Sequence, residues 1–308
     1  MVSILPSIPT PLRATLEKNG WCTDTLVWPA RVSAKTILIM VPGSPGLSDF
    51  YIKFLNLIYK DNEDHLEIIT FSHQAQTSFI TNRGDKFHNK TPVDLPGQVA
   101  HVISVFDQIY EAATATQTTN SEKPCQPRIL ICAHSIGCYM VQELYKARSE
   151  KIGEVFFIFP AVEHIGSTPK ALKIRHLRNP IIASAVSYMF ELAHRLLPEG
   201  LAMGICQKLY PFDNEQASAV YTRMLNRWSA INILHLFQSE VEIVLDLDTE
   251  FYKKHGEKFI VYYTVGDGWV TEEHYENMKN ANTNGTVILI DKNIRHDFVL
   301  RKLLNLYY

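Results

Sequence analysis

The chain has 308 residues, of which 46% are hydrophobic, and its 30 Lys and Arg against 32 Asp and Glu give a formal net charge of -2. A chain of this length and composition buries one large core or two modest ones, so it is neither disordered nor fibrous. The near-zero charge provides no long-range attraction to nucleic acid, which we therefore exclude as a partner. The five cysteines are scattered, without a CxxC pair or a histidine at metal-ligand spacing. This pattern favours a reducing compartment and no metal site.

The N-terminal segment carries three prolines and has no basic stretch ahead of a long apolar core. We therefore expect no signal peptide, and synthesis in the cytosol without export. No stretch reaches the roughly 18 uncharged apolar residues of a transmembrane helix. Attachment to a membrane surface stays open.

Short apolar runs rich in β-branched and aromatic residues recur along the chain, with helical segments between them. Runs of this kind are typical of strands buried on both faces, as in a parallel sheet covered by helices. The predicted strands are residues 36–41, 66–71, 128–133, 154–160, 258–264 and 286–290. Apolar residues at helical spacing over residues 94–113 predict a crossover helix, and the polar residues 114–127 predict a surface loop. The pattern predicts an α/β fold.

The alternation of strands and helices stops between residues 161 and 248, where helical patterns dominate. We therefore expect a core made of residues 1–160 and 249–308, with residues 161–248 inserted as a helical cap. An apolar stripe from Ile181 to Leu197 predicts one cap helix, which breaks at residues 198–200 before a second apolar segment.

Ser135 lies between a predicted strand and a predicted helix, in the sequence Ala-His-Ser-Ile-Gly. Small residues at positions 133 and 137 permit the tight turn of a nucleophile elbow, which lifts the serine hydroxyl out of the sheet. The pattern departs from G-x-S-x-G because Ala133 replaces the first glycine. The alternative is a serine that only caps a helix after a strand.

A serine nucleophile needs a base to accept its proton and an acid to orient that base. Asp267, flanked by two glycines, follows one predicted strand, and His296 follows the next. This order of serine, acid and histidine is the one found in α/β-hydrolases, and the carboxyl ends of parallel strands meet at one edge of a sheet. We therefore predict Ser135 as nucleophile, His296 as base and Asp267 as acid. Glu163 is the rival acid, and Asp297, next to His296, is expected to point away.

The oxyanion that forms on the substrate needs main-chain N–H donors. Ile136 follows the nucleophile, and Gly43 and Ser44 lie in the loop after the strand 36–41; these three are the predicted donors. The alternative is a plain strand-to-helix loop. His73 and His134 are expected to be packed or to line the substrate site. Neither G-x-G-x-x-G nor a Walker lysine is present, so we expect no nucleotide cofactor.

Four motifs, PGSPG at 42–46, AHSIG at 133–137, GDGWV at 266–270 and RHDFVL at 295–300, resemble those of the lipid droplet-associated hydrolases of the α/β-hydrolase superfamily. The resemblance extends over nearly the whole chain and implies an α/β-hydrolase fold, a mostly parallel sheet flanked by helices with a helical cap insertion. It also implies that Ser135, Asp267 and His296 form the triad. Ser44 stands where related proteins often carry asparagine, which changes the side chain of the oxyanion loop and not its backbone.

The resemblance implies a serine ester hydrolase that cleaves neutral lipids, cholesteryl esters or acylglycerols, without a cofactor. It also implies location at the lipid droplet surface and the cytosolic face of the endoplasmic reticulum. The apolar segments of residues 181–210 are the expected contact with a phospholipid monolayer, with Glu191, His194 and Arg195 facing the headgroups. The alternative for these helices is a lid packed on the core. The alternative functions are a non-catalytic droplet protein that uses the fold as an anchor, and a soluble esterase or peptidase for small substrates.

Overall fold

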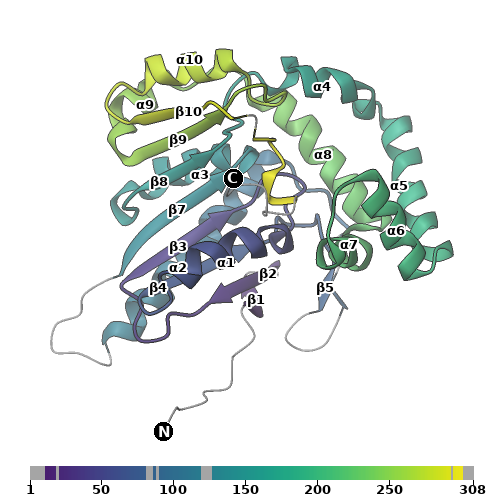
Figure 1. Cartoon of the computed structure of the whole chain (residues 1–308), viewed down its shortest axis with the longest axis horizontal. Helices are drawn as coiled ribbons and strands as arrows, with labels where there is room; N and C mark the ends of the chain where they lie inside the picture. The colour runs from purple at the N-terminus through teal and green to yellow at the C-terminus, as the bar shows by residue number, and fades with distance from the viewer. Residues whose placement is uncertain are drawn as a thin grey trace, which may run out of the picture.

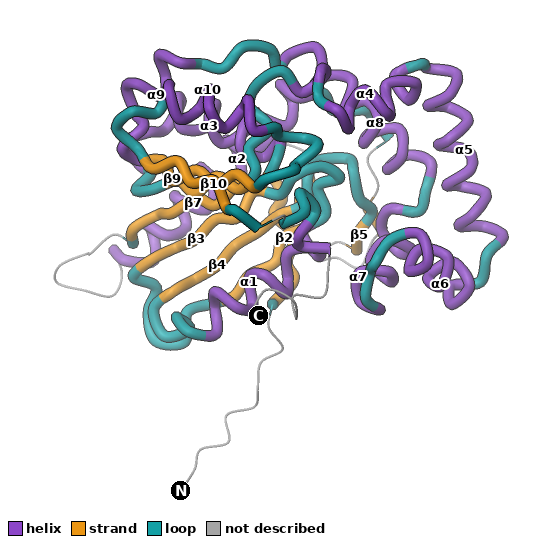
Figure 2. The backbone as a smooth tube through the Cα atoms, turned by 45° about the horizontal axis from the view of Figure 1, so that its top comes forward, coloured by secondary structure: helices purple, strands orange, loops and turns teal. Residues whose placement is uncertain are grey.

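The structure is a computed structural model of the chain, and it describes residues 11–18, 21–80, 86–87, 90–118, 127–292 and 294–300. Within these residues, eight strands form one sheet in the order β1-β2-β4-β3-β7-β8-β9-β10 (Figures 1 and 2). The first strands, β1 and β2, form an antiparallel hairpin, and β2 is antiparallel to β4. All pairs from β4 across to β10 are parallel. The bounds are β1 Leu12–Lys18, β2 Trp21–Trp28, β3 Thr36–Val41, β4 Leu66–Phe71, β7 Arg128–His134, β8 Val155–Ile158, β9 Phe259–Thr264 and β10 Thr286–Ile290.

Helices cover both faces of the sheet, and each face has its own core. One core lies between the sheet and the helices α2 (Leu95–Thr118), α3 (Ile136–Arg148), α9 (Thr249–His255) and α10 (Glu272–Ala281). The other lies between the sheet and α1 (Ile52–Lys60), with Val299 of the C-terminal segment. Strand β3 shows how one sequence serves both: Ile37 and Ile39 point to the first core, and Leu38 and Met40 to the second. The continuous apolar run therefore belongs to a strand buried on both faces.

The predicted fold class is confirmed, and all six predicted strands are present. Strand β8 is shorter than predicted because Phe159 has a positive φ of 49° and turns the chain out of the sheet. Helix α2 extends to Thr118, into the segment 114–127 that the sequence predicted as a loop. The hairpin of β1 and β2 was not predicted, nor was the small sheet of β5 (Phe79–Ile80) and β6 (Lys86–Phe87).

Between Ile158 and Phe259, where every residue is described, the regular structure is helical throughout. Its main helices are α4 (Pro169–Ile174), α5 (Pro180–Leu196), α6 (Glu199–Leu209), α7 (Asn214–Ala219) and α8 (Arg227–Ile243), which lie together to the right of the sheet in Figures 1 and 2. We call residues 161–248 the cap segment. In the part of the chain that the structure describes, no helix combines the length and hydrophobicity needed to cross a membrane.

A buried ionic cluster ties the cap segment to the sheet. Asp24 of β2 is 1% exposed, and its carboxylate accepts hydrogen bonds from Arg13 of β1 and from Arg223 of the cap segment, each at 2.7 Å. Both arginines also pair with Asp49, in the 3-10 turn Ser48–Tyr51 that precedes α1. Removing one member would leave one unbalanced charge in this largely buried cluster. The cluster therefore fixes where the cap segment meets the sheet.

Glu240 of α8 is a buried carboxyl group of the cap segment, and its Oε1 has no hydrogen-bond partner among the described residues. Burial raises the pKa of Glu240 to about 8. The carboxyl group is therefore protonated at neutral pH in the folded chain, whereas an unfolded chain ionises it at ordinary glutamate values.

We predict that Glu240→Gln flattens the pH dependence of stability. Between pH 5 and 8 the folded chain holds a proton that the unfolded chain has lost, so each pH unit lowers the free energy of unfolding by about 1.4 kcal/mol. Glutamine keeps the shape and removes this slope, so the variant gains stability over wild type as pH rises and the gain levels off above about pH 8. Urea unfolding across this pH range measures the slope. Glu250→Gln, which changes an exposed side chain, is the control and should keep the wild-type slope of stability against pH. Equal slopes for wild type and Glu240→Gln would contradict the prediction.

Candidate active site

Ser135 occupies a strained turn between β7 and α3. Its backbone has φ 54° and ψ -125°, a conformation that residues with a side chain rarely adopt. The turn is held by the Ser135 N–H, which donates to the Ile158 carbonyl at 3.1 Å, and by the Ser135 carbonyl, which accepts from Ala161 at 3.1 Å. The turn forms with alanine at position 133, which is fully buried. The side chain of Ser135 thus projects from the carboxyl edge of the parallel strands.

Two glycines let the backbone approach this turn closely. A Cβ atom at Gly137 would lie 2.5 Å from the Pro42 carbonyl oxygen, and one at Gly43 would lie 2.8 Å from the Ser135 Cβ. Both contacts are far shorter than real Cβ atoms tolerate, and their partners include main-chain atoms that cannot rotate away. The start of α3 and the end of β3 are therefore in contact only because these positions lack side chains.

His296 links the serine to an aspartate. Its Nε2 lies 2.8 Å from the Ser135 Oγ, and its Nδ1 lies 2.7 Å from the Asp267 Oδ2. Asp267 follows β9 and His296 follows β10, so both come from loops at the carboxyl edge of the sheet. The Asp267 side chain is fully buried, and that of His296 is 14% exposed. The structure thus brings together the three side chains that the sequence predicted as nucleophile, base and acid.

The Asp267 carboxylate is fixed by its own loop. Its Oδ1 accepts the main-chain N–H groups of Trp269 at 2.7 Å and Val270 at 3.3 Å, which leaves Oδ2 for His296. Gly266, just before it, has a φ of 72°. The loop therefore orients the Oδ2 acceptor toward the imidazole.

The rival acid Glu163 and the neighbouring Asp297 both bond to other residues. Glu163 is buried, its Oε2 accepts from Asn277 at 3.0 Å, and burial raises its pKa. Asp297 pairs with Arg295, with two hydrogen bonds of 2.9 Å. Neither carboxylate bonds to the His296 ring, so the geometry favours Asp267.

The predicted oxyanion donors differ in their surroundings. The N–H of Gly43 already donates to the Tyr51 hydroxyl at 2.8 Å. Because a main-chain N–H has one hydrogen, the structure favours Ser44 over Gly43 as the donor from this loop. Ile136 begins α3, where N–H groups have no acceptor within the helix. His73 contacts the loop that carries Gly43 and Ser44. Its Nε2 lies 2.9 Å from the Pro42 carbonyl oxygen, and burial lowers its pKa to about 4.

His134 was expected to be packed or to line the substrate site, and it is buried next to Ser135 and His296. Its Nδ1 lies 2.7 Å from the Tyr51 hydroxyl oxygen, and its Nε2 lies 2.9 Å from the His296 carbonyl oxygen. Burial, and then the neighbouring His296, lower the pKa of His134 well below its ordinary value. Tyr51 was not identified from the sequence, since nothing in the pattern joins it to a histidine 83 residues away.

The profile of the family described as lipid-droplet associated hydrolase matches residues 34–299. This chain belongs to that family. Lipid droplet-associated hydrolases of Gallus gallus and Mus musculus are 25% and 24% identical to it, with 86% of this chain and 80% of theirs aligned. The Drosophila melanogaster family member is 23% identical over 96% of this chain and 91% of its own. The residues of the candidate site all lie within the matched range, and the chain is a hydrolase of this family.

Comparison with solved structures shows that this chain has an α/β-hydrolase fold. A putative lipase from Acinetobacter baumannii superposes with a TM-score of 0.63 at 13% identity, covering 94% of this chain and 86% of its own. A soluble variant of monoglyceride lipase from Saccharomyces cerevisiae gives a TM-score of 0.61 at 12% identity, covering 96% and 91%. At such identities the likeness concerns the fold alone.

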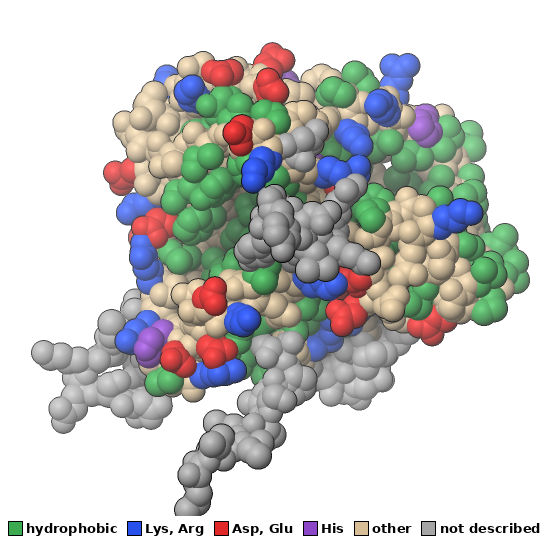
Figure 3. All heavy atoms as spheres, viewed as in Figure 1, with side chains coloured by type: hydrophobic (Ala, Val, Ile, Leu, Met, Phe, Trp, Pro, Cys, Tyr) green, Lys and Arg blue, Asp and Glu red, His purple; other side chains and the backbone are tan. Residues whose placement is uncertain are grey.

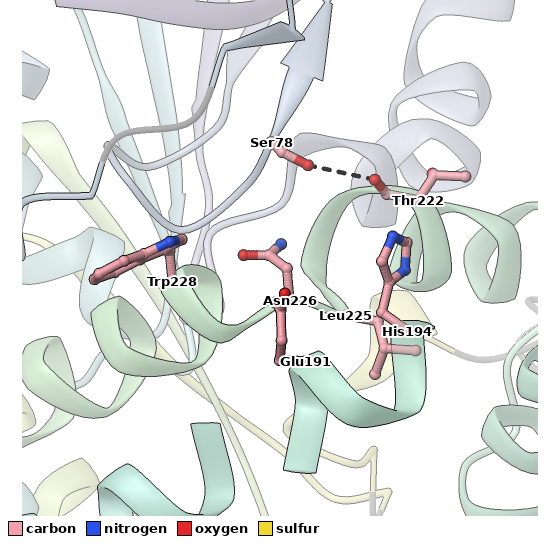
Figure 4. A pocket seen from close by; sticks show the side chains of 7 residues that line it. All are labelled: Ser78, Glu191, His194, Thr222, Leu225, Asn226 and Trp228. Carbon is pink, nitrogen blue, oxygen red and sulfur yellow. Dashed lines mark hydrogen bonds between the residues drawn. The ribbon is translucent and has the colours of Figure 1, made fainter. Parts of the chain in front are cut away.

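A pocket of about 210 Å³ lies between the cap segment and Ser78, and none of the three site residues lines it (Figure 4). Glu191 and His194 of α5 line it, together with Ser78, Thr222, Leu225, Asn226 and Trp228. Ser78, between β4 and β5, donates to the Thr222 carbonyl at 3.3 Å and so connects that part of the chain to the cap segment. Glu191 and His194, which were predicted to face lipid headgroups, are half-buried and line this pocket.

We predict that Gly137→Ala damages the Ser135 turn. The new methyl group meets main-chain atoms of Pro42 and Val41, so the start of α3 must shift, at a cost of about 1 to 3 kcal/mol of stability. Thermal unfolding measures this loss, and the rate of fluorophosphonate labelling of Ser135 should fall with it. Gly204→Ala is the matched control, since a Cβ there has open space in a helix and should leave stability unchanged or improved. A Gly137→Ala variant as stable and as reactive as wild type would contradict the prediction.

Proposed function

We propose that the chain hydrolyses carboxylic esters of neutral lipids, cholesteryl esters or acylglycerols, at the lipid droplet surface through Ser135, His296 and Asp267. The observation that supports the chemistry is the hydrogen-bonded series Ser135 Oγ, His296, Asp267 at 2.8 and 2.7 Å. The name of the family supports the location.

In the proposed reaction, the Ser135 Oγ attacks the ester carbonyl carbon while its proton moves to the His296 Nε2. The carbonyl oxygen becomes an oxyanion, which the N–H groups of Ile136 and Ser44 stabilise. The tetrahedral intermediate collapses, the C–O bond to the alcohol breaks, and His296 gives its proton to the departing alcohol. Water, activated by His296, then releases the fatty acid from Ser135. Asp267 stabilises the imidazolium in both steps.

Aromatic rings around His296 support an apolar substrate. Phe159 and Trp269 lie 6.0 and 6.3 Å from its ring between centroids, and Phe237 packs edge-on against Trp269. Aromatic side chains give a large apolar contact area. Phe159 and Phe237 are buried and Trp269 is half-buried, so the surroundings of His296 are apolar.

We expect Ser135→Ala to abolish labelling by a fluorophosphonate probe, because the probe bonds only to an activated serine oxygen. Asp267→Asn should keep the serine but lower kcat for p-nitrophenyl butyrate by about 10⁴-fold, since an amide favours the wrong imidazole tautomer. Gel fluorescence and steady-state kinetics on purified protein measure the two effects. Glu163→Gln, at the rival acid, is the control and should retain most of the activity. Equal labelling of wild type and Ser135→Ala would refute the serine mechanism.

The exposed apolar face of α5 and α6 supports contact with a lipid monolayer. Ile181 of α5 and Leu209 of α6 are 78% and 79% exposed, while Ser187 on the opposite side of α5 is fully buried. Figure 3 shows hydrophobic side chains gathered along the right edge of the molecule, over these helices. The polar side of α5 packs inward: Glu191 accepts the main-chain N–H of Arg227, at the start of α8. The arrangement argues against a lid that buries its apolar stripe in the core.

Basic residues border this apolar face. Lys173, Arg175, His176 and Arg178 are exposed in the segment just before α5. Lys and Arg next to an apolar helix face attract the anionic headgroups of a membrane surface, and each contributes about 1 kcal/mol. Of the residues predicted to face the headgroups, Arg195 is exposed. The charge pattern therefore fits an interfacial helix pair.

We predict that replacing Met189, Leu192 and Leu196 by serine releases the chain from lipid. These side chains are 64%, 55% and 68% exposed, and each contributes about 1 kcal/mol when buried in a monolayer, so the affinity should fall about 100-fold. Flotation with triolein droplets coated in phosphatidylcholine measures binding. Serine at Leu12, Val32 and Leu57, exposed residues outside the cap segment, is the control and should leave flotation unchanged. Unchanged flotation of the cap variant would contradict the lipid contact.

The second candidate function, a droplet protein that uses the fold as an anchor, rests on the same apolar face. It predicts that Ser135→Ala has wild-type flotation and no effect on the lipid composition of cells. Hydrolysis predicts accumulation of neutral lipid esters with Ser135→Ala while flotation stays normal. Lipidomic comparison of cells that express the two forms distinguishes them.

A further inference from the structure

A fixed series of buried hydrogen bonds runs beneath Ser135, from the oxyanion loop to the loop that carries His296. It joins the Gly43 N–H, the Tyr51 hydroxyl, the His134 ring and the His296 carbonyl, with separations of 2.8, 2.7 and 2.9 Å. Tyr51 and His134 are 2% and 5% exposed. The series does not touch the Ser135 Oγ or the His296 ring.

The direction of each hydrogen bond follows from the chemistry of the groups. A carbonyl oxygen only accepts, so the His134 Nε2 carries a proton and donates to His296. Burial keeps His134 neutral, so its Nδ1 has no proton and accepts from the Tyr51 hydroxyl. The Tyr51 oxygen, whose only hydrogen is used, accepts from the Gly43 N–H. Every group in the series is satisfied in this one arrangement.

We propose that Tyr51 and His134 form a positioning relay that couples the oxyanion loop at Gly43–Ser44 to the main chain of His296. Neither residue contacts the reacting atoms in this role, and the role rests on the function proposed above. At one end, the Tyr51 hydroxyl holds Gly43, the residue before the proposed donor Ser44. At the other end, His134 holds the main-chain carbonyl of His296, from whose backbone the imidazole projects.

The loop of His296 needs such support because it has no regular structure. In residues 291–297, with residue 293 outside the description, Ile294 donates to the Thr264 hydroxyl at 3.0 Å and to the Lys292 carbonyl at 2.7 Å. His134, the last residue of β7, bonds to the main chain of residue 296 itself. Since His134 immediately precedes Ser135, the base loop is fixed to the same strand end as the nucleophile.

The neutral state of His134 also matters for charge. Its ring centroid lies 5.1 Å from that of His296, which becomes an imidazolium in the proposed reaction. A second positive charge at that distance would oppose this step. The relay holds His134 in the Nε2–H form, which places a ring beside His296 without a charge.

The test uses two variants that break the relay at different bonds. Tyr51→Phe removes the hydroxyl, while His134→Gln keeps a donor near the Nε2 position and loses the Nδ1 acceptor. Each should lower kcat for p-nitrophenyl butyrate by about 10- to 100-fold, because a small displacement of the base or the oxyanion donor is costly, and KM should change little. Rates are expressed per active site, counted by fluorophosphonate titration, so that loss of folded protein does not count as loss of rate.

A double-mutant cycle separates a relay from two independent effects. Because either change breaks the same series, the double variant should lose about as much as the worse single variant. Losses in kcat that multiply, or a Tyr51→Phe variant with wild-type kcat, would overturn the proposal. Tyr252→Phe is the matched control: its fully buried hydroxyl donates to Gln142 at 2.8 Å between α9 and α3, so its loss should lower stability and leave kcat unchanged.

Nitrogen NMR of ¹⁵N-histidine-labelled protein tests the relay without turnover. The wild type should show His134 protonated at Nε2 alone at neutral pH, and Tyr51→Phe should shift the signals of the His296 ring. A His134 protonated at Nδ1, or on both nitrogens, would overturn the relay. If the fluorophosphonate probe does not label Ser135 of the wild type, the proposed function is rejected. The NMR result would still decide whether the relay exists.

Discussion

The strained turn at Ser135 is the constraint on which the rest of the site depends. Its positive φ of 54° is costly for a serine, and the surrounding contacts must offset that cost. They do so by close approach: the start of α3 lies against the end of β3, where a Cβ at Gly137 would lie 2.5 Å from the Pro42 carbonyl oxygen. The turn fixes the serine at the edge where parallel strands end. The loops after β9 and β10 reach the same edge, so a histidine and an aspartate 29 residues apart meet there.

The sheet could be predicted where strands are apolar runs and not where apolar and polar residues mix. The six predicted strands are largely apolar, and all six are found, including β10 at the edge of the sheet, whose residues are half-buried or exposed. The hairpin of β1 and β2 lies at the edge of the sheet and mixes apolar with charged and hydroxyl residues. Asp24 and its neighbours Thr23 and Thr25 are nonetheless buried. The Asp24 carboxylate is compensated by Arg13 and Arg223, and Arg223 is 199 residues away. No local pattern contains that information.

The same distinction holds in the candidate site. Ser135, Asp267 and His296 were predictable because each follows a strand that the pattern identifies, so their meeting follows from topology; their catalytic roles stay a proposal. The sequence favoured Asp267 and kept Glu163 as the rival, since both follow strands; the coordinates show that Asp267 bonds to the His296 ring. The engagement of Gly43 with Tyr51 also needed them, because it depends on how a 3-10 turn sets one hydroxyl beneath the loop. Sequence order therefore identifies side chains at strand ends, and packing decides which hydrogen bonds they make.

Hydrophobic periodicity identified α5 as an amphipathic helix but left open the direction of its apolar face. In a core helix that face points inward, whereas here Ser187 and Glu191 point toward α8 and the large apolar side chains point to solvent. Such an outward face is unfavourable in water and becomes favourable against lipid. The cap segment can present it without loosening the site, because Arg223 ties the segment to Asp24 in the sheet. The ionic cluster and the exposed helices thus have complementary roles: one fixes the cap segment to the core, and the other leaves its outer surface free to meet an apolar phase.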